Sequence, residues 1–250
     1  MKILFAGESW ELQETHMKGF DTVSMNRLVT DWAQPAFDAI RAGGMEMDYM
    51  PSHIAQTEFP ETPEALAGYD AVVLSDIGSN TLLLDPHMQF AFQPKPNRLA
   101  AIAEYVKRGG GLVMFGGYLS FSGFENKARY GMTPLAAVLP VTLLNWDDRI
   151  ETPEGAVPVV TQPGHPVLRG LPDGAWPAFL GYNRIAARPE AQTIATIGGD
   201  TFMAAMTCGR GRSFAFASDC VGHWGSKAFM EWPGYARLLQ NILHWAAGEI

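Results

Sequence analysis

The amino-acid sequence predicts an α/β protein: a three-layer α/β/α sandwich around a mostly parallel sheet, with antiparallel strands added at one edge. Three observations predict this class. Strand-length apolar runs alternate with helical segments through much of the chain. The run Ala71-Val72-Val73-Leu74 is apolar at every position, as in a parallel strand covered on both faces. From about Val141, short strands separated by turn residues replace the alternation.

The first predicted elements alternate between strand and helix. Lys2–Ala6 is a strand that ends at Gly7-Glu8-Ser9-Trp10. Helical structure is expected between Ser24 and Ala42, divided by Pro35 and ended by Gly43-Gly44. The remaining elements of this part are a strand at Met45–Met50, a short helix opened by Thr62-Pro63, and a strand at Asp70–Ser75.

A second helix and a fourth strand follow. Pro96 opens a helix whose apolar residues have the i, i+3, i+4, i+7 spacing of one buried face, at Leu99, Ile102, Ala103 and Val106. Gly109-Gly110-Gly111 ends this helix, and Leu112–Phe115 forms the next strand. Gly116-Gly117 breaks that strand before an aromatic loop that runs from Tyr118 to Tyr130.

The C-terminal part adds short strands and one long helix. The strands are expected as antiparallel additions to the sheet, at Val157–Thr161, Ile185–Ala187, Gln192–Ile197, Thr201–Met206 and Ser213–Ala217. The helix begins at Pro233, and its apolar residues share one face that should dock on the sheet. This order of elements is flavodoxin-like.

Length and composition limit the classes of partner. A chain of 250 residues suits one domain that spans residues 1–250. The net charge of −8, with scattered Lys and Arg, argues against nucleic acid and favours a small-molecule ligand. The first apolar run is shorter than a signal peptide requires, and no run of 18 apolar residues occurs, so we expect a cytoplasmic location without membrane contact. Cys208 and Cys220 are expected as reduced thiols.

The carboxyl ends of parallel strands are where open α/β sheets bind ligands. Glu8 and Trp10 follow the first strand, and Asp76 follows the third. The remaining candidates follow the fourth strand and the strand at Ser213–Ala217; they are Gly116, Gly117, Tyr118, Asp219, His223 and Trp224. His223 is the best titratable candidate because Asp219 lies near it in the sequence and can orient its ring. No dinucleotide or Walker motif occurs and the histidines lack zinc-site pairing, so neither cofactor nor metal is predicted.

Several of these segments resemble a known bacterial family of glutamine amidotransferase-like proteins. The resemblance rests on four runs and covers nearly the whole chain: Gly109 to Phe121, Tyr130 to Pro140, Gly181-Tyr182-Asn183, and Ser218 to Trp224. A looser likeness to the trehalose-utilisation (ThuA-like) proteins rests on His165 to Pro172. The resemblance implies the class I glutamine amidotransferase fold.

The resemblance also shows what is missing. Working class I glutaminases place a cysteine on a strained strand-to-helix turn and pair it with a histidine from a later strand. The matching turn reads Phe115-Gly116-Gly117-Tyr118 and has no cysteine, serine or threonine, so the thiol route to glutamine hydrolysis is not expected. Gly116-Gly117 is either a tight turn or a cradle of free N–H groups for an anion. Cys220 is either a buried inert thiol or, less favoured, a displaced nucleophile.

Other residues leave alternatives open. Tyr118, Phe121 and Phe124 either line a pocket or cap the core. Glu8 and Asp76 either cap backbone N–H groups or face each other, where they can bind a cation or exchange a proton.

Three functions remain open at this point. The first is an enzyme that binds or hydrolyses a small polar metabolite, a sugar or an amide, with Asp219, His223 and Tyr118 as catalytic residues. The second is a non-catalytic binding or sensing module on the same scaffold. The third is an oligomeric scaffold subunit, because the apolar segment from Leu82 to Phe92 is expected to be buried against the body or against another copy.

Overall fold

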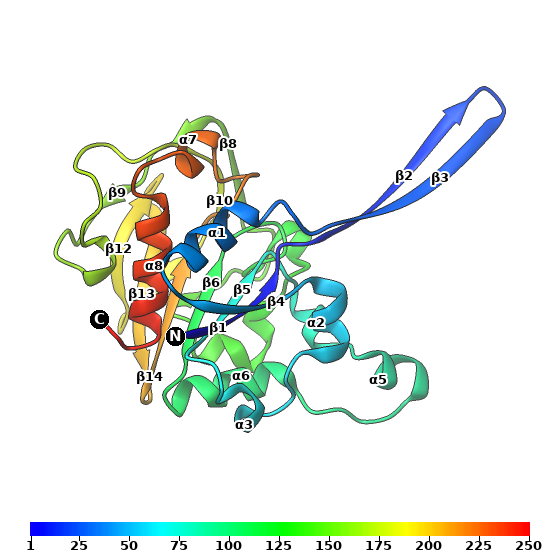
Figure 1. Cartoon of the computed structure of the whole chain (residues 1–250), viewed down its shortest axis with the longest axis horizontal. Helices are drawn as coiled ribbons and strands as arrows, with labels where there is room; N and C mark the ends of the chain where they lie inside the picture. The colour runs from blue at the N-terminus through cyan, green and yellow to red at the C-terminus, as the bar shows by residue number, and fades with distance from the viewer.

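An eight-stranded sheet forms the centre of the computed structural model, which describes residues 1–250 (Figure 1). The strands lie in the order β4-β1-β5-β6-β14-β13-β12-β9. The first five run parallel to one another, and each of the last three runs antiparallel to the strand before it in this order. The bounds of these strands are β1 Lys2–Gly7, β4 Glu46–Met50, β5 Ala71–Ser75, β6 Gly111–Phe115, β9 Val159–Val160, β12 Gln192–Ile197, β13 Asp200–Cys208 and β14 Gly211–Phe216.

Helices cover both faces of this sheet. On one face α8 packs against β6 and β14 and beside α1; on the other, α2, α3, α4 and α6 lie next to one another. The helices are α1 Gln34–Ala42, α2 Ser52–Glu58, α3 Pro63–Leu66, α4 Ser79–Leu83, α5 Pro86–Ala91, α6 Arg98–Lys107, α7 Lys227–Met230 and α8 Tyr235–Ala246, with 3-10 turns at Phe124–Asn126, Tyr130–Met132, Pro134–Ala137 and Pro166–Leu168. None of them is long and apolar enough to cross a membrane.

The predicted fold class and the four predicted parallel strands are confirmed. β1, β5 and β6 are buried almost throughout because helices cover both of their faces. They belong to one connected core of 61 buried apolar residues. Thr62 caps α3 as expected, since its side chain accepts the N–H of Ala65. The next helix, α6, begins at Arg98 and not at Pro96, with the Asn97 side chain accepting the N–H of Ala100.

Three small sheets lie outside the central one. β10 (Phe179–Asn183) pairs with β8 (Arg149–Ala156), and β11 (Ala186–Ala187) pairs with β7 (Val141–Thr142). β2 (Trp10–Lys18) and β3 (Asp21–Val29) form a hairpin that projects from the body (Figure 1). We call this hairpin the arm.

The arm corrects the prediction of helical structure from Ser24. The helix begins only at Gln34, and Ser24–Val29 is strand. Here apolar and polar residues alternate with a period of two, as in Val23-Ser24-Met25-Asn26, and Gly19 has a φ of 63° in the turn. The prediction was wrong because Pro35 was taken as a break within a helix, whereas it lies in the first turn of one.

The C-terminal strands need two corrections. β14 was expected as an antiparallel addition, but it lies between β6 and β13 and runs parallel to β6. The hairpin turn at Gly209-Arg210 folds β14 inward, where it covers the apolar edge of β6. The segment at Ile185–Ala187 does not extend the sheet as a strand; Ala186 and Ala187 pair with β7 instead.

The segment from Leu82 to Phe92 divides into two parts. Leu82 is buried, and Asp85 is held by an ion pair with the buried Arg98 at 2.7 Å. Phe90 and Phe92 are exposed to solvent. Burial against the body therefore accounts for the first part only.

Candidate functional site

Two acidic residues follow β1 and β5 in an unusual backbone conformation. Glu8 has a φ of 48° and Asp76 a φ of 43°, values that residues other than glycine seldom adopt. The two turns are joined, because the N–H of Glu8 donates to the carbonyl oxygen of Ser75 at 2.9 Å. Both carboxyl groups are buried at the carboxyl edge of the sheet, as the sequence predicted for this edge.

Gly117, after β6, lies between two carboxylates. Its φ is 133°, and a Cβ atom added there would be 2.6 Å from Asp219 Oδ1 and 2.8 Å from Asp76 Oδ1. The two oxygens therefore approach the same point from β5 and from the turn after β14. Any side chain at this position would collide with them, so the space that a nucleophile would need is filled by acid side chains.

The N–H groups of the glycine turn are already bonded. Gly116 donates to the carbonyl oxygen of Ser218 at 2.8 Å, and Gly117 donates to Asn183 Oδ1 at 3.0 Å. Asn183 returns a hydrogen bond to the carbonyl oxygen of Gly117 and another to Asp148. The alternative of a cradle of free N–H groups at Gly116 and Gly117 is therefore wrong, and the turn serves close packing between the ends of β6 and β14.

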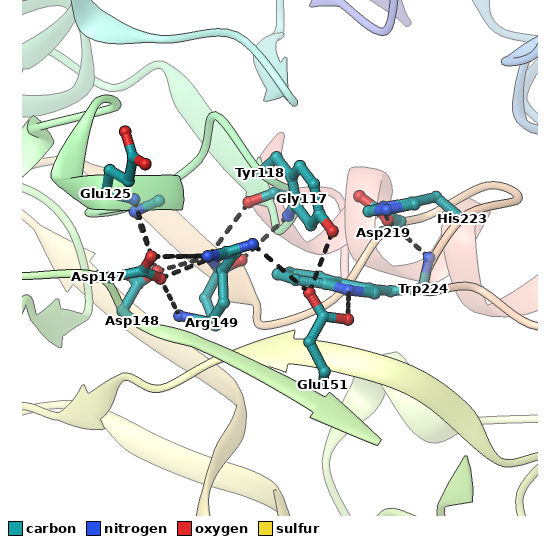
Figure 2. A network of polar contacts seen from close by, with 12 residues as sticks. Gly117, Tyr118, Glu125, Asp147, Asp148, Arg149, Glu151, Asp219, His223 and Trp224 are labelled. Carbon is teal, nitrogen blue, oxygen red and sulfur yellow. Dashed lines mark hydrogen bonds and ion pairs between the residues drawn. The ribbon is translucent and has the colours of Figure 1, made fainter. Parts of the chain in front are cut away.

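Asp219 and His223 form a directly bonded pair in the loop after β14 (Figure 2). His223 Nδ1 lies 2.7 Å from Asp219 Oδ2, which also accepts the N–H of Trp224 at 2.8 Å. Asp219 is buried, whereas the His223 side chain is 36% exposed. A buried carboxylate thus fixes an imidazole ring whose other nitrogen, Nε2, has no protein partner. The predicted pairing of these two residues is found in the structure.

Aromatic rings surround the imidazole. The Tyr118 ring meets it edge-on with centroids 4.5 Å apart, and the Trp224 ring stacks on it at 5.5 Å. Phe124 stacks on Tyr118. Phe121, by contrast, is completely buried and belongs to the core. Of the three aromatic candidates, Tyr118 and Phe124 line the site and Phe121 does not.

Glu151 on β8 closes the outer side of this group. Its two carboxylate oxygens accept hydrogen bonds from Tyr118 Oη at 3.1 Å and from Trp224 Nε1 at 3.0 Å (Figure 2). Arg149, two residues earlier, lies 3.8 Å from Glu151 and over the Phe124 ring. Neither residue was predicted from the sequence, because β8 reaches the site only through its pairing with β10. The alternation of charged residues along Arg149-Ile150-Glu151 was the available signal.

Burial raises the pKa of Asp76, Asp219 and Glu8. Desolvation, reinforced by Asp219, raises the pKa of Asp76 from 3.8 to about 7. Desolvation likewise raises the pKa of Asp219, and desolvation together with the charges of Asp219 and Asp76 places that of Glu8 well above its ordinary value. The raised pKa of Glu8 favours its protonated form, and the Ser75 hydroxyl donates a hydrogen bond to its carboxyl group.

His223 and Cys220 respond to the same surroundings in different ways. Burial alone would lower the pKa of His223, but the hydrogen bond to Asp219 and the charges of Asp219, Asp76 and Glu151 together raise it. Desolvation and the nearby Glu8 raise the pKa of the Cys220 thiol well above its ordinary value. Cys220 is 0% exposed and its Sγ lies 3.6 Å from Ser75 Oγ. It is thus a buried neutral thiol, as the favoured alternative had it.

Trp10 occupies a different place from the other candidates. It stands at the base of the arm, 6.2 Å from the Trp32 ring, and lines an open hollow of about 330 Å³. This hollow lies beyond the ends of β1 and β5, where the strand order reverses; its wall includes Ser9, Ser52, His53, Gln56, Thr81 and Leu119, but not Asp219, His223 or Tyr118. His53 Nδ1 is buried there without a hydrogen-bond partner. No three of the chain's His, Cys, Asp and Glu residues are placed to hold a metal ion.

The chain is similar to a known protein family and to solved structures. A family model described as "Putative glutamine amidotransferase" matches residues 2–248. Two solved structures from Salmonella typhimurium are similar over 98% of this chain and 99% of their own: cytoplasmic protein STM3548, at 45% identity and a TM-score of 0.94, and cytoplasmic protein STM1381 of strain LT2, at 47% and 0.93. Their names agree with the cytoplasmic location expected from the sequence.

A more distant likeness concerns the fold alone. A ThuA-like protein from Bacteroides uniformis is 12% identical with a TM-score of 0.60, over 98% of this chain and 90% of the other. This agrees with the looser likeness expected from His165 to Pro172. No curated protein sequence matches the chain.

Proposed function

The chain belongs to the glutamine amidotransferase-like family, and from this premise we propose that it binds and hydrolyses a small polar metabolite, a sugar or an amide, at the carboxyl edge of its sheet. His223 acts as the base, Asp219 orients it, and Tyr118 and Glu151 form the wall against which the ligand lies. The observation that carries the proposal is the bond of 2.7 Å between buried Asp219 and half-exposed His223.

The pair supports general base catalysis. Because Nδ1 of His223 is hydrogen-bonded to Asp219, its Nε2 is left to take a proton from water. The oxygen of that water then attacks the carbonyl or anomeric carbon of the ligand, and the bond to the leaving group breaks. The imidazolium returns the proton to the leaving group, and Asp219 stabilises the positive charge in the meantime.

The thiol route of working glutaminases is a poor alternative for this chain. A cysteine at Gly117 would place its Cβ within 3 Å of two carboxylate oxygens. Cys220 is buried, and its raised pKa keeps it protonated. Water activated by His223 is therefore the nucleophile that the proposal requires.

The walls of the site suit a ligand with several hydrogen-bonding groups. Glu151 is half-exposed, and each of its oxygens retains a lone pair beside the bonds to Tyr118 and Trp224. Sugar hydroxyls or an amide N–H group can donate to such oxygens. The aromatic ring of Tyr118 offers the apolar contact that sugar rings commonly use.

The test measures hydrolysis of small carboxamides, glutamine and asparagine among them, and of nitrophenyl glycosides. We expect no release of ammonia from glutamine above background, turnover of another member of the set, and loss of that turnover in His223→Ala. His87→Ala is the matched control, because His87 forms a similar pair with Asp85, at 3.0 Å, on an exposed segment. The turnover should also fall as pH falls through the raised pKa of His223, since only the neutral ring accepts a proton.

Two outcomes decide against parts of the proposal. Equal turnover in His223→Ala and in the wild type would remove His223 from the mechanism. Glutamine hydrolysis that disappears in Cys220→Ala would make Cys220 the nucleophile. A non-catalytic binding module is indicated instead if no compound is turned over but one raises the melting temperature of the wild type and not that of His223→Ala.

A further inference from the structure

The arm is an element without tertiary support. β2 and β3 pair over nine residues each, so at about 3.3 Å per residue they extend roughly 30 Å. Every residue from Gln13 to Leu28 is exposed, and Figure 1 shows the arm projecting away from the sheet and its helices. An isolated two-stranded hairpin is only marginally stable in water. A regular arm of this length therefore indicates that something packs against it.

Exposed apolar side chains are frequent on the arm and on the α5 segment. Figure 1 shows both on the same side of the body but well apart, with the arm at the upper right and α5 at the lower right. Eight of the fourteen large apolar side chains that are exposed belong to the arm, to its base or to the α5 segment: Met17, Phe20, Val23, Met25, Leu28, Trp32, Phe90 and Phe92. Such a concentration marks a protein–protein contact.

The outer edge of β3 is an open strand edge, because the arm is a sheet of only two strands. We propose that β3 pairs antiparallel with β3 of a second copy of this chain, about a two-fold axis through Ser24. The two arms then form one four-stranded ribbon that joins two bodies. This inference does not depend on the proposed hydrolytic function.

The side chains of β3 are complementary to themselves in this register. Asp21, Val23, Met25 and Arg27 alternate along the strand and share one face. With Ser24 on the axis, Val23 lies opposite Met25 of the partner subunit, and Asp21 lies opposite Arg27 of the partner subunit. Each contact occurs twice by symmetry. Directly opposed residues of this kind are those that stabilise antiparallel strands.

Neighbouring registers lose this match. An axis at Met25 sets Val23 against Arg27 of the partner subunit, and an axis at Val23 sets Asp21 against Met25 of the partner subunit. Both charges are available for pairing between copies. Arg27 makes only a long contact of 3.9 Å with Glu14, and Asp21 has no ion pair within the chain.

The edge of β2 is less suitable than that of β3. Pairing Glu14 with Lys18 of the partner subunit would place His16 against the same residue of the second copy, with like charges facing when the rings are protonated. In that register Leu12 would need Phe20, which lies in the turn outside the strand.

The contact consists of backbone hydrogen bonds and the side chains next to them. Pairing of the two β3 edges joins nine residues of each copy, over roughly 30 Å of strand. Edge pairing leaves both faces of the ribbon uncovered, so we expect a weak to moderate dimer.

Disulfide trapping tests the register. In Ser24→Cys the two introduced thiols face each other across the axis, so mild oxidation should cross-link two chains. Asn26→Cys is the matched control: Asn26 lies on the same face of β3 but opposite Thr22 of the partner subunit, so it should cross-link far more slowly. The wild type, whose Cys208 is half-buried and Cys220 buried, should stay uncross-linked.

Charge reversal provides the second measurement, by sedimentation equilibrium. The wild type should be dimeric, and Asp21→Arg or Arg27→Asp should each weaken dimerisation at least tenfold because like charges then face at both contacts. The variant with both changes should regain dimerisation, because the pairs are restored with exchanged signs. A monomeric wild type, equal cross-linking of the two cysteine variants, or no recovery in the double variant would each overturn the proposal.

Discussion

Asp76→Asn should make the protein more stable at alkaline pH. Asp76 is buried and its pKa is raised from 3.8 to about 7, first by desolvation and then by the charge of Asp219. The folded state therefore holds a proton that the unfolded state has lost over the range between these two values. The stability that the protonated Asp76 contributes is fully present below its unfolded pKa and is lost as pH rises through its folded pKa. Asparagine cannot ionise, and its amide oxygen can still accept the N–H of Leu119, now 2.6 Å from Asp76 Oδ1.

The size of the effect follows from the shift. The folded and unfolded pKa values of Asp76 differ by about 3 units, which lowers the free energy of unfolding of the wild type by about 4 kcal/mol at pH 8, where Asp76 is ionised in both states. At pH 5, where Asp76 is still protonated in the folded state, the same relation lowers it by about 2 kcal/mol. The gain in free energy of unfolding should thus be about 2 kcal/mol larger at pH 8 than at pH 5.

Urea unfolding of the wild type and the variant at both pH values measures this difference. Asp173→Asn is the control, because it is the same substitution at a residue that is exposed in a loop. If Asp76→Asn and the wild type lose stability in parallel between pH 5 and pH 8, the burial argument for Asp76 is refuted.

Two further changes probe the glycine turn and the thiol. Gly117→Ala should lower the free energy of unfolding by roughly 2–5 kcal/mol in urea titrations, because it adds a collision with Asp219 and Asp76 to the strain of a positive φ. Gly174→Ala, at a φ of 109° in open space, should lose only about 1–2 kcal/mol, and equal losses would show that crowding has no part. Cys220→Ala should reduce stability by no more than about 1–2 kcal/mol and leave any hydrolytic activity intact; loss of activity with stability preserved would assign the thiol a chemical role.

Some of the site was accessible from the sequence because its residues directly follow strands. Glu8, Asp76, Gly117 and Asp219 stand at strand ends, and parallel strands bring their carboxyl ends to one edge. The absence of a nucleophile at the turn after β6 could also be predicted from the sequence, since that inference needs only the residue types at Gly116 and Gly117. The physical cause of that absence, two carboxylates in the space of the missing side chain, depends on β5 and β14 being placed on either side of β6.

The arm shows a different limit of sequence reasoning. Ser24 to Val29 was expected as helix, although its alternation is that of a strand. Periodicity is normally interpreted through burial against a core, and no core lies beside these residues. Where neither face of a strand is buried, the alternation of apolar and polar residues does not show which face would point toward a core.

The sequence by itself determined the parallel strands, the helices α3, α6 and α8 that follow clear start signals or carry an apolar face, and the strand ends at which polar groups gather, because apolar periodicity and turn residues act locally along the chain. Only the tertiary structure decided which strand became the neighbour of β6, which acids share a desolvated space, and that Glu151 closes the site from a separate small sheet. These depend on contacts between residues far apart in the chain. Their energies come from burial and from charge at short range, which the order of residues does not display.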